Sequence, residues 1–108
     1  MAKFLIQISY ADSALAELVK HPEDRGAAVS EWYERLGGKI EVFYHCFGDY
    51  DLVVIAEFPS NETMRAISFA TRSTGFAKDH KITSLLTTEE SVGALRRAGS
   101  ADFRPPGG

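Results

Sequence analysis

The sequence Gly48-Asp49-Tyr50-Asp51 lies between two apolar runs near the middle of the chain. The run before it is Ile40-Glu41-Val42-Phe43-Tyr44-His45-Cys46-Phe47, and the run after it is Leu52-Val53-Val54-Ile55-Ala56-Glu57-Phe58. A short connection that contains Gly and Asp between two such runs predicts a tight β-hairpin. This stretch therefore places two antiparallel strands at the centre of the fold.

Further strands and helices are predicted on both sides of the hairpin. Residues 3–10 alternate between two faces as a strand does, and two helical segments separated by His21-Pro22 follow. Residues 60–75 read as a helix that begins with a Ser or Asn cap and ends at a glycine. Residues 80–88 read as a strand, and the capping-box spacing of Thr87 and Glu90 predicts a last helix.

The apolar positions of the helical segments predict which faces are buried. The expected stripes are Leu15, Leu18 and Val19 in the first segment, Val29, Trp32, Tyr33 and Leu36 in the second, and Met64, Ile67 and Thr71 in the third. His21 and His80 are expected in exposed loops. Cys46 is expected to be a buried thiol on the face that it shares with Tyr44.

This order of elements, β-α-β-β-α-β with a terminal helix, predicts an α+β fold. Two right-handed crossovers place the first and third strands in the middle of an antiparallel sheet, with the helices on one face. The architecture is ferredoxin-like. We expect one domain over residues 1–98 and a flexible Pro/Gly-containing tail over residues 99–108.

Composition narrows the classes of function. The chain has 108 residues, a net charge of -3, 44% hydrophobic residues and 25% charged residues, which is ordinary globular composition. No run of Lys or Arg is present, which argues against a nucleic-acid surface. No apolar stretch is long enough for a membrane span or a signal peptide, so we expect a cytoplasmic protein. Cys46 is the only cysteine, which excludes an intrachain disulfide.

Both faces of the expected sheet carry apolar side chains. Strict alternation turns Phe4, Ile6, Ile8, Ile40, Val42, Leu52, Val54 and Ala56 toward the helices. The other face then carries Leu5, Gln7, Phe43, His45, Phe47, Val53, Ile55 and Glu57. This second face is too apolar to meet water, so we expect a two-fold related copy of the chain to cover it. Gln7, His45 and Glu57 would pair across that interface or line a ligand cavity.

The residues of the hairpin turn have two interpretations. Tyr50 and Asp51 present a phenol and a carboxylate at one end of the sheet, where they could bind or polarise a ligand. Turn chemistry also explains them, because Gly48 allows the turn and Asp51 can accept from backbone N–H groups.

Three further residues are candidates for a ligand site. His45 could act as a general base, since the pKa of histidine lies near neutrality, or as a haem ligand inside the barrel, or it could be an interface histidine. Tyr10 ends a strand, where its hydroxyl could point into a pocket, and Arg25 could hold an anion. The three histidines have no metal-ligand spacing, so we expect neither a metal nor another cofactor.

Several short motifs, taken in order, resemble the GYD domain family. They are Gly37-Gly38-Lys39, then Gly48-Asp49-Tyr50-Asp51, then a Val/Ile-rich strand that ends in Glu57-Phe58-Pro59. Pro22-Glu23-Asp24-Arg25 and the strand from Lys81 to Leu86 also resemble this family, so the likeness covers roughly residues 3 to 92. The resemblance implies a dimeric α/β-barrel protein, mostly bacterial, without an established biochemical function and without catalytic residues to carry over.

Two functions stay open at this point. The first is a homodimeric module that binds or senses a small apolar molecule. The second is a small cofactor-free enzyme, monooxygenase- or isomerase-like, that acts on an apolar or aromatic compound with His45, Tyr50 or Glu57 as acid–base groups. The wider dimeric α/β-barrel group includes both enzymes and ligand sensors, so the fold does not choose between them.

Overall fold

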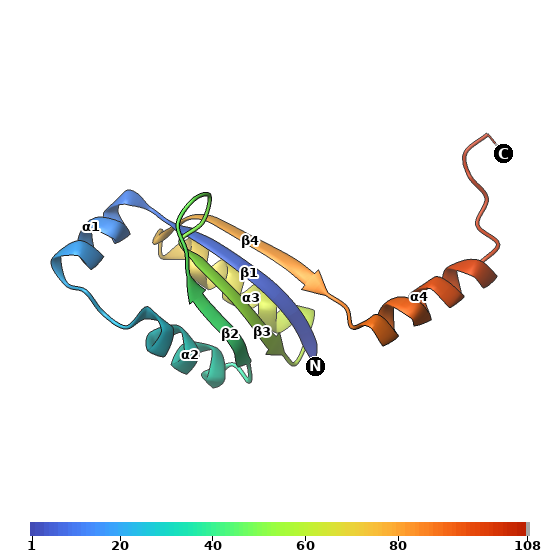
Figure 1. Cartoon of the computed structure of the whole chain (residues 1–108), viewed down its shortest axis with the longest axis horizontal. Helices are drawn as coiled ribbons and strands as arrows, with labels where there is room; N and C mark the ends of the chain where they lie inside the picture. The colour runs from blue at the N-terminus through green and yellow to red at the C-terminus, as the bar shows by residue number, and fades with distance from the viewer. Residues whose placement is uncertain (108) are drawn as a thin grey trace.

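The computed structural model describes residues 1–107; Gly108, the last residue of the expected tail, lies outside them. The elements in chain order are β1 (Ala2–Tyr10), α1 (Asp12–Lys20), α2 (Arg25–Arg35), β2 (Lys39–His45), β3 (Leu52–Phe58), α3 (Asn61–Ser73), β4 (Ala77–Leu85) and α4 (Thr88–Ser100). The sheet order is β2-β3-β1-β4 and all neighbours are antiparallel. This confirms the ferredoxin-like α+β fold (Figure 1).

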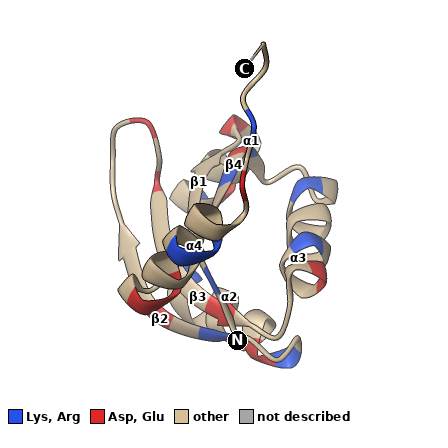
Figure 2. Ribbon diagram, turned by 90° about the vertical axis from the view of Figure 1, so that its right-hand side faces the viewer, with Lys and Arg blue, Asp and Glu red and all other residues tan. Residues whose placement is uncertain are grey.

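The core lies between the sheet and helices α2 and α3. Alternate residues of β1 and β3 are buried there, among them Ile6, Val54 and Phe58. Val29 and Tyr33 from α2 and Met64 and Ile67 from α3 complete the cluster. In the side view of Figure 2, α3 lies to one side of the sheet. The opposite side of the sheet, which we call the open face, has no helix of residues 1–107 packed over its centre.

Strand β2 contains a β-bulge, and its side chains are therefore divided between the two faces of the sheet differently from what we expected. The register shifts between Ile40 and Val42, so Val42 lies opposite Ile55 and Phe43 lies opposite Val54. The extra residue of a bulge reverses the alternation of every side chain that follows it. Phe43 and His45 are therefore on the helix side, with their rings 5.3 Å apart, and the assignment to the open face was wrong.

The same bulge places Val42 and Tyr44 on the open face, opposite Ile55 and Val53. Tyr44 is 69% exposed there. Phe47 lies on neither face, because it is in the loop between β2 and β3 and is 98% exposed. Since Tyr44 does not face the helices, Cys46 does not share a core face with it. Cys46 is half-buried in the loop, where its thiol donates to the carbonyl oxygen of Tyr50 at 3.1 Å.

Three other predictions differ from the structure. Leu36, expected on the buried stripe of the second helical segment, is 39% exposed at the C-cap of α2. The α1 stripe is not buried: Leu15 and Val19 are exposed, because α1 lies beyond the end of the sheet and not over it (Figure 1). His80 is not in an exposed loop, because β4 begins at Ala77 and includes it. It pairs with Ile8, whose side chain belongs to the core, and is half-buried. Of the helices in residues 1–107, none is long and apolar enough to cross a bilayer.

Candidate functional site

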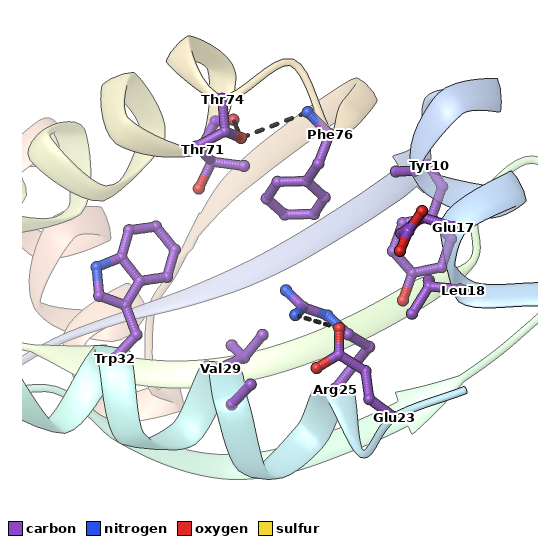
Figure 3. A pocket seen from close by; sticks show the side chains of 12 residues that line it. Tyr10, Glu17, Leu18, Glu23, Arg25, Val29, Trp32, Thr71, Thr74 and Phe76 are labelled. Atoms are coloured by element: carbon purple, nitrogen blue, oxygen red, sulfur yellow. Dashed lines mark hydrogen bonds and ion pairs between the residues drawn. The ribbon is translucent and has the colours of Figure 1, made fainter. Parts of the chain in front are cut away.

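A pocket of about 560 Å³ lies where α1, α2, the end of α3 and the end of β1 meet. This volume falls in the range of roughly 300–1,000 Å³ that small-molecule sites occupy. Its walls are mostly apolar, with Leu18 from α1, Val29 and Trp32 from α2, and Phe76 from the segment before β4 (Figure 3).

Aromatic side chains form two sides of the pocket. Trp32 and Phe76 lie across the space from each other in Figure 3. The ring of Phe76 is 6.4 Å from that of Tyr10, and the guanidinium carbon of Arg25 lies 5.6 Å from the Phe76 ring centroid. The indole of Trp32 is anchored against Tyr33, 5.7 Å away in the core. A flat apolar molecule would therefore find ring faces and edges on both sides.

Arg25 and Tyr10 supply polar groups at one end of the pocket. Arg25 is the first residue of α2, where Asp24 caps the helix by accepting from the N–H of Ala27 at 2.9 Å. Its Nη1 lies 3.2 Å from Oε1 of Glu23, and a guanidinium has further N–H donors. Burial raises the pKa of Tyr10, against the opposing effect of the Arg25 charge. The Tyr10 phenol therefore stays neutral and can donate or accept a hydrogen bond.

Thr71 supplies a polar group from α3. The residue is 1% exposed, and its Oγ1 has no hydrogen-bond partner among residues 1–107. Figure 3 shows this oxygen pointing into the pocket. The hydroxyl of Thr74, one turn further, donates instead to the carbonyl oxygen of Thr71 at 2.7 Å. An unsatisfied buried hydroxyl is costly, so a ligand that bonds to the Thr71 hydroxyl would gain stability. The oxygen exposes less than 1 Å² to water, so a small shift of the side chains around it must open the way.

Of the residues predicted from the sequence, Tyr10 and Arg25 line this pocket. Asp51 lies behind it and accepts a hydrogen bond from the backbone N–H of Tyr10 at 2.8 Å. Gly48 adopts a φ of +131° in the preceding turn, which glycine accepts readily. The loop 46–51 thereby brings Asp51 back to the end of β1.

The other predicted residues lie elsewhere. Gln7 and Glu57 belong to the open face, where Glu57 is 3.7 Å from Nζ of Lys3. His45 lies at the end of β2 beside Phe43, and Tyr50 lies in the loop. Within residues 1–107, these four side chains do not line the pocket, and His45, Tyr50 and Glu57 do not share one cavity.

The other lining residues were not predicted as site residues, and Trp32, Thr71 and Phe76 are the most important of them. Trp32 and Thr71 were assigned to buried helical stripes, and Phe76 was assigned no role. Thr71 carried the one usable signal, because it is a polar residue on the buried stripe of its helix. Within residues 1–107, no three His, Cys, Asp or Glu side chains gather as metal ligands would.

The sequence model of the GYD domain matches residues 4–95. The chain belongs to the GYD domain family. No curated protein sequence matches this GYD domain. Among solved structures, a hypothetical protein PHS023 from Pyrococcus horikoshii is 17% identical, with a TM-score of 0.51 over 81% of this chain and 92% of the other. The crystal structure of FFRP-DM1 is 16% identical, with a TM-score of 0.49 over 80% of this chain and 100% of the other. The first likeness supports the fold of the GYD domain alone.

Proposed function

We propose that this GYD domain is a small-molecule binding or sensing module and that its ligand occupies the pocket between α1, α2 and α3. One observation carries the proposal. The buried Thr71 hydroxyl points, without a partner among residues 1–107, into a largely apolar space of about 560 Å³. Binding sites commonly combine an apolar lining with a few such polar anchors.

The lining favours a flat, mainly apolar ligand with one or two polar groups. Its body would lie between Trp32 and Phe76, and one polar group would meet the Thr71 hydroxyl. A carbonyl or hydroxyl at the other end would meet Arg25 and Tyr10. The single cation of the lining is balanced by Glu17 and Glu23. These charges favour an uncharged ligand over a multiply charged anion.

We also infer that the protein works as a homodimer through the open face of its sheet. This face carries Leu5, Val53 and Ile55 on the central strands and Tyr44 on an edge strand. Such a surface is more apolar than water-facing sheets usually are. A second copy would cover it symmetrically, as is common for soluble oligomers. The pocket lies on the helix side, so binding does not require the dimer.

Neighbouring alanines on α2 provide the test of the pocket. Ala28 lines the pocket, whereas Ala27 is exposed on the same helix. Ala28→Leu fills space that the ligand needs, and Ala27→Leu adds the same atoms outside it. The probe is N-phenyl-1-naphthylamine, an uncharged aromatic dye that accepts energy from Trp32, the only tryptophan.

We expect energy transfer from Trp32 to the dye in the unmodified chain. Ala28→Leu should weaken dye binding about tenfold or more, whereas Ala27→Leu should leave it unchanged. Thermal unfolding would verify that both variants are folded. Dye binding that is equal in the two variants, or that is absent from the unmodified chain, would contradict the proposed pocket.

A further inference from the structure

The helix α4 carries an apolar stripe that has no partner among residues 1–107. None of its residues, Thr88–Ser100, is buried, and Leu95 is 69% exposed. Val92, one helical turn before Leu95, is 38% exposed. Figure 1 shows α4 continuing beyond the end of β4, away from the sheet. The helix is therefore formed but leaves its apolar side chains in water.

A capping box stabilises the first turn of α4, close to the end of β4. The N–H of Thr87 donates to Oε1 of Glu90 at 3.0 Å, and the N–H of Glu90 donates to Oγ1 of Thr87 at 3.1 Å. Only Leu86 and Thr87 separate β4 from α4. The capping box therefore starts the helix only two residues after β4. A helix of 13 residues is also marginal in water unless something packs against it.

The chain exposes more surface than a compact monomer of its size, as expected if part of that surface is covered by a partner. The surface is 7631 Å², whereas a compact monomer of 11.9 kDa exposes about 6,000 Å². The Cα radius of gyration is 17.5 Å, against about 13 Å for a compact domain of this length. The excess area is about 1,600 Å². It comes from α4, from the exposed residues 101–107 after it and from α1, so α4 supplies only part of the roughly 800 Å² that each partner contributes to a stable interface.

We propose that α4 is an exchanged arm whose Val92–Leu95 stripe packs on the open sheet face of a second copy of this chain. That face is the matching apolar surface, and Tyr44 is exposed on it. In a two-fold dimer each arm meets one open face, so both unpartnered surfaces are covered at once. This inference rests on the proposed dimer and is independent of the pocket.

The charges beside the open face and beside the α4 stripe are of opposite sign, which favours this docking. On the open face, Lys3 is shared by Glu41 at 2.9 Å and Glu57 at 3.7 Å. Helical spacing places Arg96 one residue after Leu95, beside the apolar stripe. Figure 2 shows the basic segment of α4 in blue. An arginine from the second copy would give the two carboxylates a second cation.

The experiment combines light scattering with amide hydrogen exchange of the full-length chain across a range of protein concentrations. The test variant is Leu95→Gln, and the control is Ala94→Gln, which lies on the other side of the same helix. Both residues are exposed, so neither change should prevent folding. We expect a dimer in which residues 88–100 are protected from exchange. Leu95→Gln should weaken dimerisation about tenfold or more and remove that protection, whereas Ala94→Gln should not.

Three other outcomes would overturn the exchanged arm. A dimer with unprotected α4 rejects the arm and leaves the proposed dimer standing. A monomer with protected α4 shows that the helix folds back on its own chain, which rejects both the exchanged arm and the proposed dimer. A monomer with unprotected α4 also rejects both. Dye binding at the Trp32 pocket is unaffected by any of these results.

Discussion

The carboxylate of Asp51 accepts a hydrogen bond from the backbone N–H of Tyr10 at 2.8 Å, across 41 residues of sequence. The N–H of Asp51 in turn donates to the carbonyl oxygen of Ile8 at 2.8 Å. These two bonds fasten the β2–β3 loop to the end of β1. They also hold the backbone of Tyr10 where its ring forms one side of the pocket.

We expect Asp51→Ala to destabilise the fold, because it leaves the partly buried N–H of Tyr10 without its acceptor. The free energy of unfolding, measured in urea, should fall by about 1–3 kcal/mol. Asp51→Asn keeps an acceptor oxygen and should cost less. Asp49 is exposed in the same loop, so Asp49→Ala should change stability by at most about 0.5 kcal/mol. Equal stability of the two alanine variants would show that the Tyr10–Asp51 bond contributes nothing.

Thr71 and Thr74 should respond in opposite directions to the same substitution. Thr71→Val removes a buried hydroxyl that has no partner among residues 1–107, so we expect an increase in stability of about 1 kcal/mol. Thr74→Val removes a hydroxyl that donates to Thr71 and accepts from Phe76, so we expect a loss of about 1 kcal/mol. Urea unfolding of both variants measures these changes. A loss of stability in Thr71→Val would mean that its hydroxyl is satisfied in the free protein.

His80 should make stability depend on pH. Burial, followed by the nearby charge of Arg72, lowers the pKa of His80 below its ordinary value of 6.5, against the opposing effect of Asp79. The unfolded chain therefore binds a proton more readily than the folded one. The contribution of His80 is complete above about pH 6.5 and is lost as the pH falls through the folded-state pKa.

Comparison with a variant isolates this contribution from the other titrating groups. The stability of the unmodified chain minus that of His80→Phe should decrease between about pH 7.5 and about pH 5.5. Urea unfolding at each pH provides the measurement. A constant difference for His80→Phe would show that His80 titrates alike in the folded and unfolded chains.

Local patterns predicted the order and pairing of the elements but not the faces of β2. The alternation in β1 and β3 is unbroken, and their inward residues are buried as expected. The β2 bulge depends on how Glu41 and Val42 fit opposite Ile55, which is a property of two paired strands. One extra residue then exchanged the faces of Phe43 and Tyr44.

The pocket was harder to predict, because it depends on the spaces between elements. Tyr10 and Arg25 were predicted from local chemistry, as a strand end and a helix start. Trp32 and Thr71 follow the same apolar period as true core residues. They line a pocket and not a filled core because α1 lies beyond the end of the sheet and forms another wall of the space. A helical period shows which side of a helix faces inward, but it does not show what lies opposite.

Gly38 should tolerate no side chain, for a reason that differs from that of Gly37. Gly37 ends α2 with a φ of +81°, a conformation that glycine adopts readily. Gly38 is buried, and a Cβ there would overlap the ring of Phe58 and lie 3.0 Å from the carbonyl oxygen of Tyr33. That carbonyl already accepts from the N–H of Gly38 at 2.8 Å, so the backbone cannot move away without losing the bond.

We therefore expect Gly38→Ala to lower the free energy of unfolding by about 1–3 kcal/mol or more, as overpacking in a core does. Gly93 is the matched control, because a Cβ there meets no atom of residues 1–107 within 4 Å. Gly93→Ala should strengthen α4 by up to about 1 kcal/mol through helix propensity alone. Urea unfolding and far-ultraviolet circular dichroism measure the two effects. If Gly38→Ala unfolds at the same urea concentration as the unmodified chain, the Phe58 ring has room to move, and close packing at this site is wrong.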